Sequence, residues 1–287
     1  MAVIPFVPSL EADVQNIGPT FKDVRITFDL TNVPAGTQIG QNALPSTGNQ
    51  PFASANNSLI TPNFGFDVTV SGAGTIATLY DSTNTTGLDP DLEGGPNGFN
   101  WAGGNLDRDN DPNAPILGNL LIVQHPDNFT VDSNNLFTQP NDYPADNQVR
   151  LDFETGFTEI AVAWADNEEG GTSVTYGLDN GDTATIDFGE FIDSSSAFYD
   201  SSLAYDDHYA NLLPTITVSD LINVLGVSND ATQIDWVEFN WGGPSGGASG
   251  GLAFLEGKTV DPVPEPSSFA LLLGIASALF LVRRRNR

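Results

Sequence analysis

The sequence predicts an all-β protein, an antiparallel β-sandwich or jelly roll, followed by a linker and a single C-terminal transmembrane helix. Three observations support this prediction. Short runs that alternate apolar with polar residues, or that are rich in β-branched residues, recur along the chain between turn residues. Only one short segment of the body has the pattern of a helix. An apolar run without charges near the C-terminus ends in a cluster of arginines.

The expected strands are short and are separated by turn residues. They lie at residues 23–30, 64–70, 74–80, 117–124, 149–153, 157–164, 172–178, 183–191, 215–218, 233–241 and 251–256. Asn180-Gly181 marks the clearest hairpin, since these residues accept the positive φ angles of a tight turn. The one expected helix spans residues 219–225, with Ser219-Asp220 as its N-terminal cap. Many short strands without alternating helices favour an antiparallel sandwich or jelly roll over a parallel sheet.

The domain organisation follows from composition. Residues 1–258 are expected to form one acidic β-sandwich domain, residues 259–268 a linker, and residues 269–287 the membrane-spanning tail. The glycine-rich segment 242–251 (GGPSGGASGG) is expected to be a flexible loop between the last two strands.

The charge balance excludes several classes of function. The chain has 9 Lys and Arg against 37 Asp and Glu, a formal net charge of −28. A surface of this sign repels the phosphates of nucleic acid, so we expect no nucleic-acid partner. The absence of cysteine excludes disulfides, thiol nucleophiles and thiolate metal sites.

The basic residues are concentrated in the tail. Up to Pro262 there are 5 basic residues against 36 acidic ones, whereas Arg283, Arg284, Arg285 and Arg287 end the chain. Residues 269–282 (FALLLGIASALFLV) carry no charge and would form a helix of about 21 Å, short of a hydrocarbon core of about 30 Å. The flanking serines and the arginine stems extend this to a marginal span. Positive flanks stay in the cytoplasm, which places the acidic body on the other side of the membrane.

Val263, Pro264, Glu265 and Pro266 stand immediately before this apolar run. A Pro-Glu-Pro motif, a short apolar helix and an arginine-rich end, in that order, resemble the C-terminus of proteins with a PEP-CTERM sorting domain. The resemblance covers roughly the last 25 residues. It implies export, recognition by a membrane-embedded exosortase, and cleavage near Pro264–Pro266. It also implies a destination at the cell surface or in the exopolysaccharide matrix.

The N-terminal segment departs from the pattern of exported proteins. Residues 1–13 lack a basic start, and Pro5 and Pro8 interrupt any apolar helix, so they do not resemble a signal peptide. Either the signal lies upstream or export uses another route.

The densest acidic stretch, residues 81–111, is the candidate metal site. Calcium takes six to eight oxygen ligands, and closely spaced carboxylates and loop carbonyls supply them. Clustered carboxylates also repel one another unless a cation offsets the charge. The alternative is a solvated acidic loop. The expected calcium ligands are Asp81, Asp89 and Asp91, followed by Asp107, Asp109 and Asp111.

A second resemblance is looser and covers about residues 74–189. Tyr80-Asp81, the Asp89–Leu92 loop, the Gly118–Leu121 segment and Asp152-Phe153 resemble parts of a β-rich extracellular domain that is common among exported proteins of this class. This resemblance supports the fold and secretion rather than an activity.

Enzymatic readings are weaker. Ser245 and Ser249 both fit G-x-S-x-G, but a strand rather than a helix follows and both histidines lie upstream. Carboxylate pairs such as Glu168-Glu169 or Asp187 with Glu190 are expected by chance in so acidic a chain. Asp206-Asp207-His208 reads as a solvated loop. We therefore expect no catalytic residue, although glycan-active chemistry on a jelly roll stays an alternative.

Aromatic residues suggest carbohydrate binding as the second function. Exposed rings on β-sandwiches stack on sugar faces, and Trp101 lies in a Gly/Asn loop suited to this role, with Trp241 at the start of the glycine loop. Trp164 and Trp236 alternate with apolar residues and are expected in the core. The expected function is that of an exported, exosortase-sorted protein of the cell surface or extracellular matrix, non-enzymatic and calcium-binding. The alternative is a carbohydrate-binding module.

Overall fold

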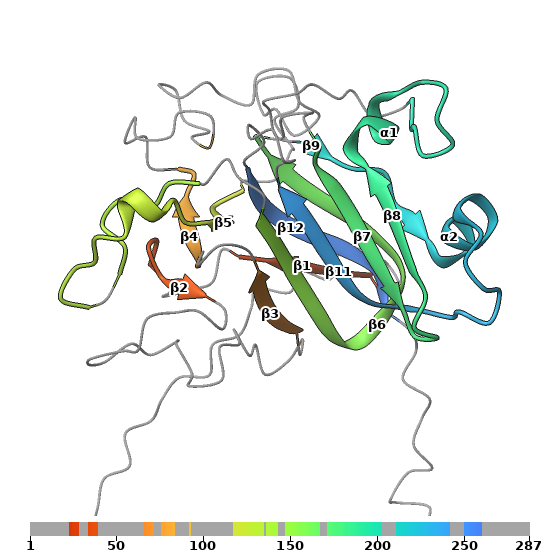
Figure 1. Ribbon diagram of the computed structural model, residues 1–287, viewed down its shortest axis with the longest axis horizontal. Helices are drawn as coiled ribbons and strands as arrows, with labels where there is room; N and C mark the ends of the chain where they lie inside the picture. Colours follow the sequence, from red (N-terminus) through yellow and green to blue (C-terminus); the bar gives the residue numbers. More distant parts are fainter. Residues whose placement is uncertain are drawn as a thin grey trace, which may run out of the picture.

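A computed structural model of the chain describes residues 23–28, 34–39, 66–71, 76–83, 92, 117–134, 136–142, 147–166, 171–201, 211–241 and 250–259. These residues form an antiparallel, curled β-sheet with few helices (Figure 1). The all-β prediction is therefore confirmed. Its strands are β1 (Asp23–Thr27), β2 (Gln38–Ile39), β3 (Phe66–Ser71), β4 (Ala77–Asp81), β5 (Asn119–Val123), β6 (Asn147–Ala165), β7 (Ser173–Leu178), β8 (Thr183–Asp187), β9 (Asn211–Leu212), β10 (Ile216–Thr217), β11 (Ile234–Trp241) and β12 (Gly251–Thr259).

The path of the sheet runs β2-β4-β5-β12-β6-β11-β7-β8, and β1, β3, β9 and β10 pair alongside it. The long strand β6 lies in the middle of this path, between β12 and β11 (Figure 1). Its first half, residues 147–153, lies between β3 and β11. Its second half, up to Ala165, pairs with β12 on one side and with β9 and β10 on the other. Two separate strands were predicted here; the structure joins them, since no turn interrupts residues 154–156.

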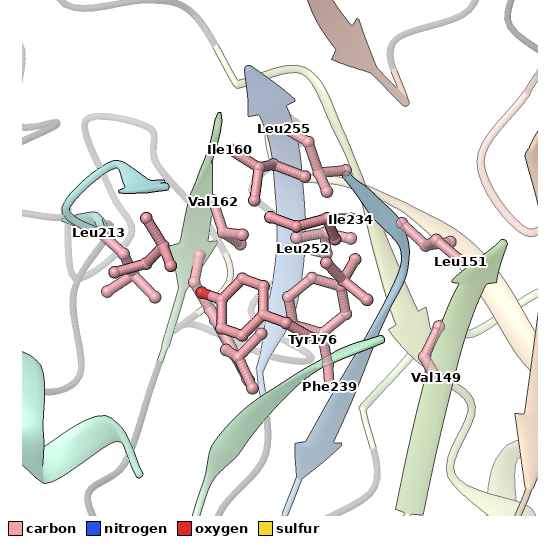
Figure 2. Close-up of a cluster of buried hydrophobic side chains, with 14 of the residues drawn as sticks. Val149, Leu151, Ile160, Val162, Tyr176, Leu213, Ile234, Phe239, Leu252 and Leu255 are labelled. Carbon is pink, nitrogen blue, oxygen red and sulfur yellow. The ribbon is translucent and has the colours of Figure 1, made fainter. Parts of the chain in front are cut away.

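The main core lies between the two halves of the curled sheet. Val149 and Leu151 from the first half of β6, and Ile160 and Val162 from the second half, belong to one buried cluster (Figure 2). Trp164 crosses this core edge-on, with its ring centroid 5.5 Å from that of Phe239 and 5.4 Å from that of Trp241. The sheet therefore folds back on itself, and aromatic packing holds its two halves together.

A second apolar cluster lies on the opposite face of β5 and β12. Leu121 and Val123 belong to the main core, whereas Leu120 and Ile122 belong to the second cluster together with Leu92. Every residue of β5 is buried, because both faces of the strand are covered. This explains why β5 reads as a continuous apolar run rather than as an alternating one.

The helix α2 (Val218–Leu225) is confirmed, but its cap differs from the prediction. Thr217, not Ser219, is the N-terminal cap: its hydroxyl accepts the amide of Asp220, and the Asp220 carboxylate accepts the amide of Thr217. This reciprocal capping box starts the helix one residue earlier than expected. Gly226 ends it with a φ of 72°.

A further short helix, α1 (Phe188–Ile192), corrects the prediction of a strand over residues 183–191. The strand β8 ends at Asp187, and the chain then turns so that Phe188 and Phe191 are both buried. Residues three apart share one face of a helical turn, which brings both rings into the core. Both helices lie beside β8, at one side of the sheet (Figure 1).

The segment that follows β5 folds against the edge of the sheet. It contains the short 3-10 helix η2 (Pro126–Asn128), and its base is held by the fully buried Gln124. The side-chain amide nitrogen of Gln124 donates to the carbonyls of Asn128 and Gln139, at 3.2 and 3.0 Å. Gly36 joins the segment to β4, because it donates to the carbonyl of Leu79 while its own carbonyl accepts the amide of Phe137.

The predicted membrane-spanning tail, residues 269–287, lies outside the described residues, as does the linker from residue 260 onward. Among the helices that the structure describes, none is long and apolar enough to span a bilayer.

Candidate functional site

Of the predicted calcium ligands, the structure describes Asp81 alone. It lies at the end of β4, where its Oδ1 atom accepts the amide of Thr83 at 3.0 Å and the Thr83 hydroxyl at 2.6 Å. The carboxylate therefore closes a local turn. Asp89, Asp91, Asp107, Asp109 and Asp111 lie outside the described residues, and so does Trp101. Within the described part of the chain, no three His, Asp or Glu side chains are close enough to hold a metal ion.

Several described carboxylates serve to fasten turns. Burial raises the pKa of the Asp179 carboxyl, but the hydrogen bonds that it accepts from Thr232 and Gln233 outweigh this and lower the pKa below its ordinary value. The Asp193 carboxylate accepts the amide and the hydroxyl of Ser195, and these bonds lower its pKa. Asp179 connects the turn after β7 to the residues before β11, and Asp193 closes a local turn after α1, so both have a structural role.

The most distinctive polar surface is the outward side of the first half of β6 and of β11, β7 and β8. The inward side chains of these strands belong to the core, so the side chains between them point outward. We name this surface the outer face. It consists of Gln148, Arg150 and Asp152 from β6, Trp236, Glu238 and Asn240 from β11, Ser173, Thr175 and Gly177 from β7, and Thr183, Thr185 and Asp187 from β8.

Strand register arranges the outer face in rows. Arg150 lies opposite Glu238, which lies opposite Thr175, which in turn lies opposite Thr185. With strands about 4.8 Å apart, such a row crosses about 14 Å of the sheet. Acceptors, donors and hydroxyl groups therefore follow one another along one row across the sheet.

Trp236 was predicted in the core, and this prediction is wrong. The pairing of β11 with both β6 and β7 shifts its register between Ile234 and Trp236, which is a β-bulge. The bulge leaves Asp235 and Trp236 both half-buried, whereas Val237 is buried again. Bulges re-aim side chains in this way.

The sequence contains a signal for this outcome. Val237, Phe239 and Trp241 alternate in one phase, and Ile234 is in the other, so one residue between them must break the alternation. The same phase buries Trp241, which is 1% exposed, and this corrects the expectation that its ring faces solvent beside the glycine loop.

Gly177 provides the seat on which Trp236 lies. A Cβ on Gly177 would fall 1.8 Å from Cε2, 2.0 Å from Nε1 and 2.4 Å from Cδ2 of the indole. These three atoms belong to the five-membered ring, so the glycine backbone lies against the face of that ring. On the other side, the guanidinium carbon of Arg150 stands 3.8 Å from the ring centroid. The indole is thus held between a glycine and a cation.

Arg150 is oriented by two partners at once. Besides the indole, it contacts Asp152, whose two carboxylate oxygens accept from Nε at 2.8 and 3.0 Å and whose Oδ1 also accepts from Nη2. This leaves the two Nη1 hydrogens of Arg150 directed away from the fork. The side chains of Arg150 and Asp152 remain 33% and 38% exposed, so the pair is in contact with solvent.

Glu238 adds a second carboxyl group beside this pair. Its burial raises the pKa above the ordinary value; the positive charge of Arg150 lowers it and the negative charge of Asp152 raises it again. The three side chains carry one positive and two negative charges when ionised. The outer face therefore combines a clamped guanidinium, carboxylate acceptors and a half-exposed aromatic ring.

Comparison with known proteins identifies the tail of the chain. Residues 262–285 match the family model of the PEP-CTERM protein-sorting motif, which confirms the resemblance found in the sequence. The match includes Val263, Pro264, Glu265 and Pro266 and the first three arginines of the terminal cluster. No curated protein and no solved structure matches the chain.

Proposed function

We propose that this chain, which carries a PEP-CTERM protein-sorting motif, is a non-enzymatic protein of the cell surface or extracellular matrix that associates with exopolysaccharide. The motif supports export, processing by an exosortase and association with the cell envelope. The finer assignment rests on the acidic β-rich body that precedes it. We take that body to be a β-sandwich of the jelly-roll type that is displayed outside the cytoplasm.

The observation that carries the proposal is the order of charges along the chain around the motif. An acidic body is followed by the Pro-Glu-Pro motif, the apolar run 269–282 and Arg283 to Arg285. We propose that the apolar run is a transmembrane helix and that the arginines keep the end of the chain in the cytoplasm. The acidic body then faces the outside, where its charge keeps it soluble.

Three described carboxylates have a structural role. Asp179, Asp193 and Asp230 accept hydrogen bonds that hold turns. These bonds lower the pKa of each carboxyl, and at Asp179 they do so despite the opposing effect of burial. All three carboxyls are therefore ionised at neutral pH. A general acid needs the opposite shift. The Glu238 carboxyl, which lies beside Arg150 and Asp152 on the outer face, has its pKa raised by burial.

Deletion of residues 263–287 tests the sorting proposal. The truncated protein lacks the motif, the apolar run and the arginines, so we expect it to move from the envelope fraction to the medium. The measurement is an immunoblot of both fractions from cells that express either form. A matched control replaces Arg283, Arg284 and Arg285 by lysine, which keeps the charge and should keep the protein in the envelope. Retention of the truncated protein in the envelope would contradict the proposal.

We also propose that calcium stabilises the acidic segment 81–111, because a cation offsets the repulsion among its carboxylates. Millimolar calcium should raise the melting temperature of the full chain, since a ligand at a hundredfold excess over its Kd adds about 2.7 kcal/mol of stability. The combined change Asp89→Asn and Asp91→Asn should remove this response, whereas Asp127→Asn, in the exposed helix η2, should retain it. An unchanged melting temperature of the native chain in calcium refutes the proposal.

A further inference from the structure

We propose that the free edge of β8 binds an extended, basic polypeptide segment, which adds to the sheet as a further strand. The edge consists of the backbone N–H and C=O groups of Thr183 and Thr185 and the backbone N–H group of Asp187. The proposal goes beyond the function proposed above, because it rests on β8 and its surroundings and not on the sorting motif.

β8 is the last strand of the sheet path and pairs with β7 alone among the described strands. In an antiparallel pair, hydrogen-bonded and non-hydrogen-bonded positions alternate. The amide of Leu178 donates to the carbonyl of Asp182, and the amide of Phe188 donates to the carbonyl of Thr172, so residues 182 and 188 are both in the hydrogen-bonded phase. The residues of β8 in the other phase are Thr183, Thr185 and Asp187. Their backbone groups therefore point away from β7.

A side-chain contact and the hydrogen bonds agree with this phase. The hydroxyl groups of Thr175 and Thr185 lie 2.9 Å apart, as expected of a non-hydrogen-bonded pair, in which side chains are closer together. Within the described part of the chain, no hydrogen bond uses the outward backbone groups of Thr183 or Thr185. Both residues are exposed, and so is Asp187, whose carbonyl begins α1 and whose N–H stays at the edge. The edge is therefore accessible to another strand.

The edge of β8 lacks the features with which proteins usually prevent strand addition. The common ones are proline, lysine, a β-bulge, a covering element or a very short edge strand. β8 reads Thr-Ala-Thr-Ile-Asp, its one charged residue is the last, and its pairing with β7 is regular throughout. The other end of the sheet path is β2, which has only two residues. Of the two ends of the path, β8 is therefore the one that offers a row of backbone groups to a partner.

The charge around the edge identifies the class of partner. No lysine or arginine occurs in the sequence between Arg150 and Lys258. Acidic residues, in contrast, flank β8: Asp182 precedes it, Asp187 ends it, and the exposed Glu190 follows in α1. Such a surface attracts a basic segment and repels the same edge of a second copy, which brings the same charges. We therefore assign the edge to a basic segment of another polypeptide.

The end of α2 adds apolar side chains on the same side of the molecule. Val224 and Leu225 are 46% and 37% exposed, and they are the exposed large hydrophobic residues of the described chain. The residues after α2 are joined to the turn before β8, because the amide of Ser228 donates to the carboxylate of Asp182 at 2.8 Å. Figure 1 shows α2 beside β8. In strand addition, main-chain hydrogen bonds supply affinity and side-chain contacts supply specificity, and this side of the molecule offers both.

Fluorescence anisotropy of the full-length chain, kept soluble in a polyoxyethylene detergent, tests the proposal. The probe is a labelled synthetic peptide in which lysine alternates with valine and threonine. A second peptide has the same sequence but is methylated on every other backbone nitrogen, which keeps the charge and blocks strand pairing. A third peptide has glutamate in place of lysine. We expect the first peptide to bind about tenfold more tightly than either of the others, because only it combines free backbone groups with positive charge.

Variants at Thr185 test the edge itself. Thr185→Pro removes an outward N–H and no hydrogen bond to β7, and edge strands tolerate proline, so binding of the first peptide should weaken about tenfold. The matched control Thr185→Val keeps the N–H and the branched side chain and should bind as the native chain does. Thr185→Lys keeps the N–H but adds a positive charge, which should weaken binding about threefold. Melting curves accompany every variant. If Thr185→Pro fails to fold, Thr185→Lys and the methylated peptide decide the test.

Four results would overturn the proposal. The first three are failure of the basic peptide to bind, equal binding of the methylated peptide, and native affinity of a folded Thr185→Pro variant. The fourth comes from sedimentation velocity of the protein alone: a dimer of the native chain that Thr185→Pro abolishes assigns the edge to a second copy instead of a basic segment. These results are independent of the localisation experiment, because none of the variants alters the sorting motif.

Discussion

Replacing Trp164 by alanine is expected to lower the free energy of unfolding by about 3–5 kcal/mol, the usual cost of removing a large aromatic side chain from a core. Trp164 is 0% exposed, and its ring meets those of Phe239 and Trp241 edge-on. It extends from the second half of β6 to the strand that pairs with the first half. The cavity would therefore open where the two halves of the sheet meet. Urea denaturation followed by near-ultraviolet circular dichroism measures the effect.

The matched control is the same change at Trp236. This side chain is half-buried on the outer face, so its loss should cost less than about 2 kcal/mol, made up of reduced burial and the loss of its contact with Arg150. Trp164→Phe should also cost far less than Trp164→Ala. Phenylalanine keeps an aromatic ring and removes a buried indole N–H that has no hydrogen-bond partner among the described residues. Equal costs for Trp164→Ala and Trp236→Ala would contradict the assignment of Trp236 to the surface.

Replacing Gly36 by alanine is the second large effect. Gly36 has a φ of 81°, and a Cβ there would fall 2.3 Å from the carbonyl oxygen of Phe137. The left-handed conformation costs a non-glycine residue about 1–2 kcal/mol, and the backbone clash adds to this. Gly36 also carries the hydrogen bonds that join β4 to the segment after β5. We expect a loss of more than about 2 kcal/mol and faster amide exchange at Phe137.

Gly181→Ala separates the two causes. Gly181 has a φ of 89° in the turn between β7 and β8, but its missing Cβ would meet no atom within 4 Å. This variant therefore reports the conformational cost alone, about 1–2 kcal/mol. The difference in stability between the Gly36→Ala and Gly181→Ala variants, measured by thermal melts, gives the contribution of the close contact between Gly36 and Phe137. If the two variants melt together, the close approach of Gly36 to Phe137 does not contribute.

Most of the strands could be predicted because alternation is a local property. β3, β4, β5, β7, β11 and β12 overlap the predicted ranges, since each has its own apolar or alternating pattern. β2 and β9 have two residues each and were missed, whereas the equally short β10 lies in the predicted range 215–218 because the residues around it alternate. The union of two predicted strands into β6 was missed for another reason. Residues 154–156 have the composition of a turn, but pairing with neighbours on both halves keeps the strand continuous.

The surface around Trp236 could not be predicted for the same reason, because it depends on which strands pair. Carbohydrate binding was predicted for Trp101 in a glycine-rich loop, and this residue lies outside the described residues, so the prediction stays a prediction. Trp236 was predicted to lie in the core because it alternates with the apolar Ile234 two residues earlier. That rule fails at a β-bulge. The sequence already shows that the apolar alternation changes phase between Ile234 and Val237. Which face Trp236 takes depends, however, on the strands that pair with β11 on either side.

The β-rich body and the sorting tail follow from the sequence alone, because both depend on residues that are close together in the chain. A strand is recognised from alternate neighbours, and the tail from a motif, an apolar run and arginines in direct succession. The outer face depends on tertiary structure. Trp236 needs Gly177 on one neighbouring strand and Arg150 on the other. These residues are far apart in the sequence and meet because β11 pairs with β7 on one side and with β6 on the other. Local side-chain patterns determine which residues form strands, whereas the choice of neighbouring strands arises from burying a shared core.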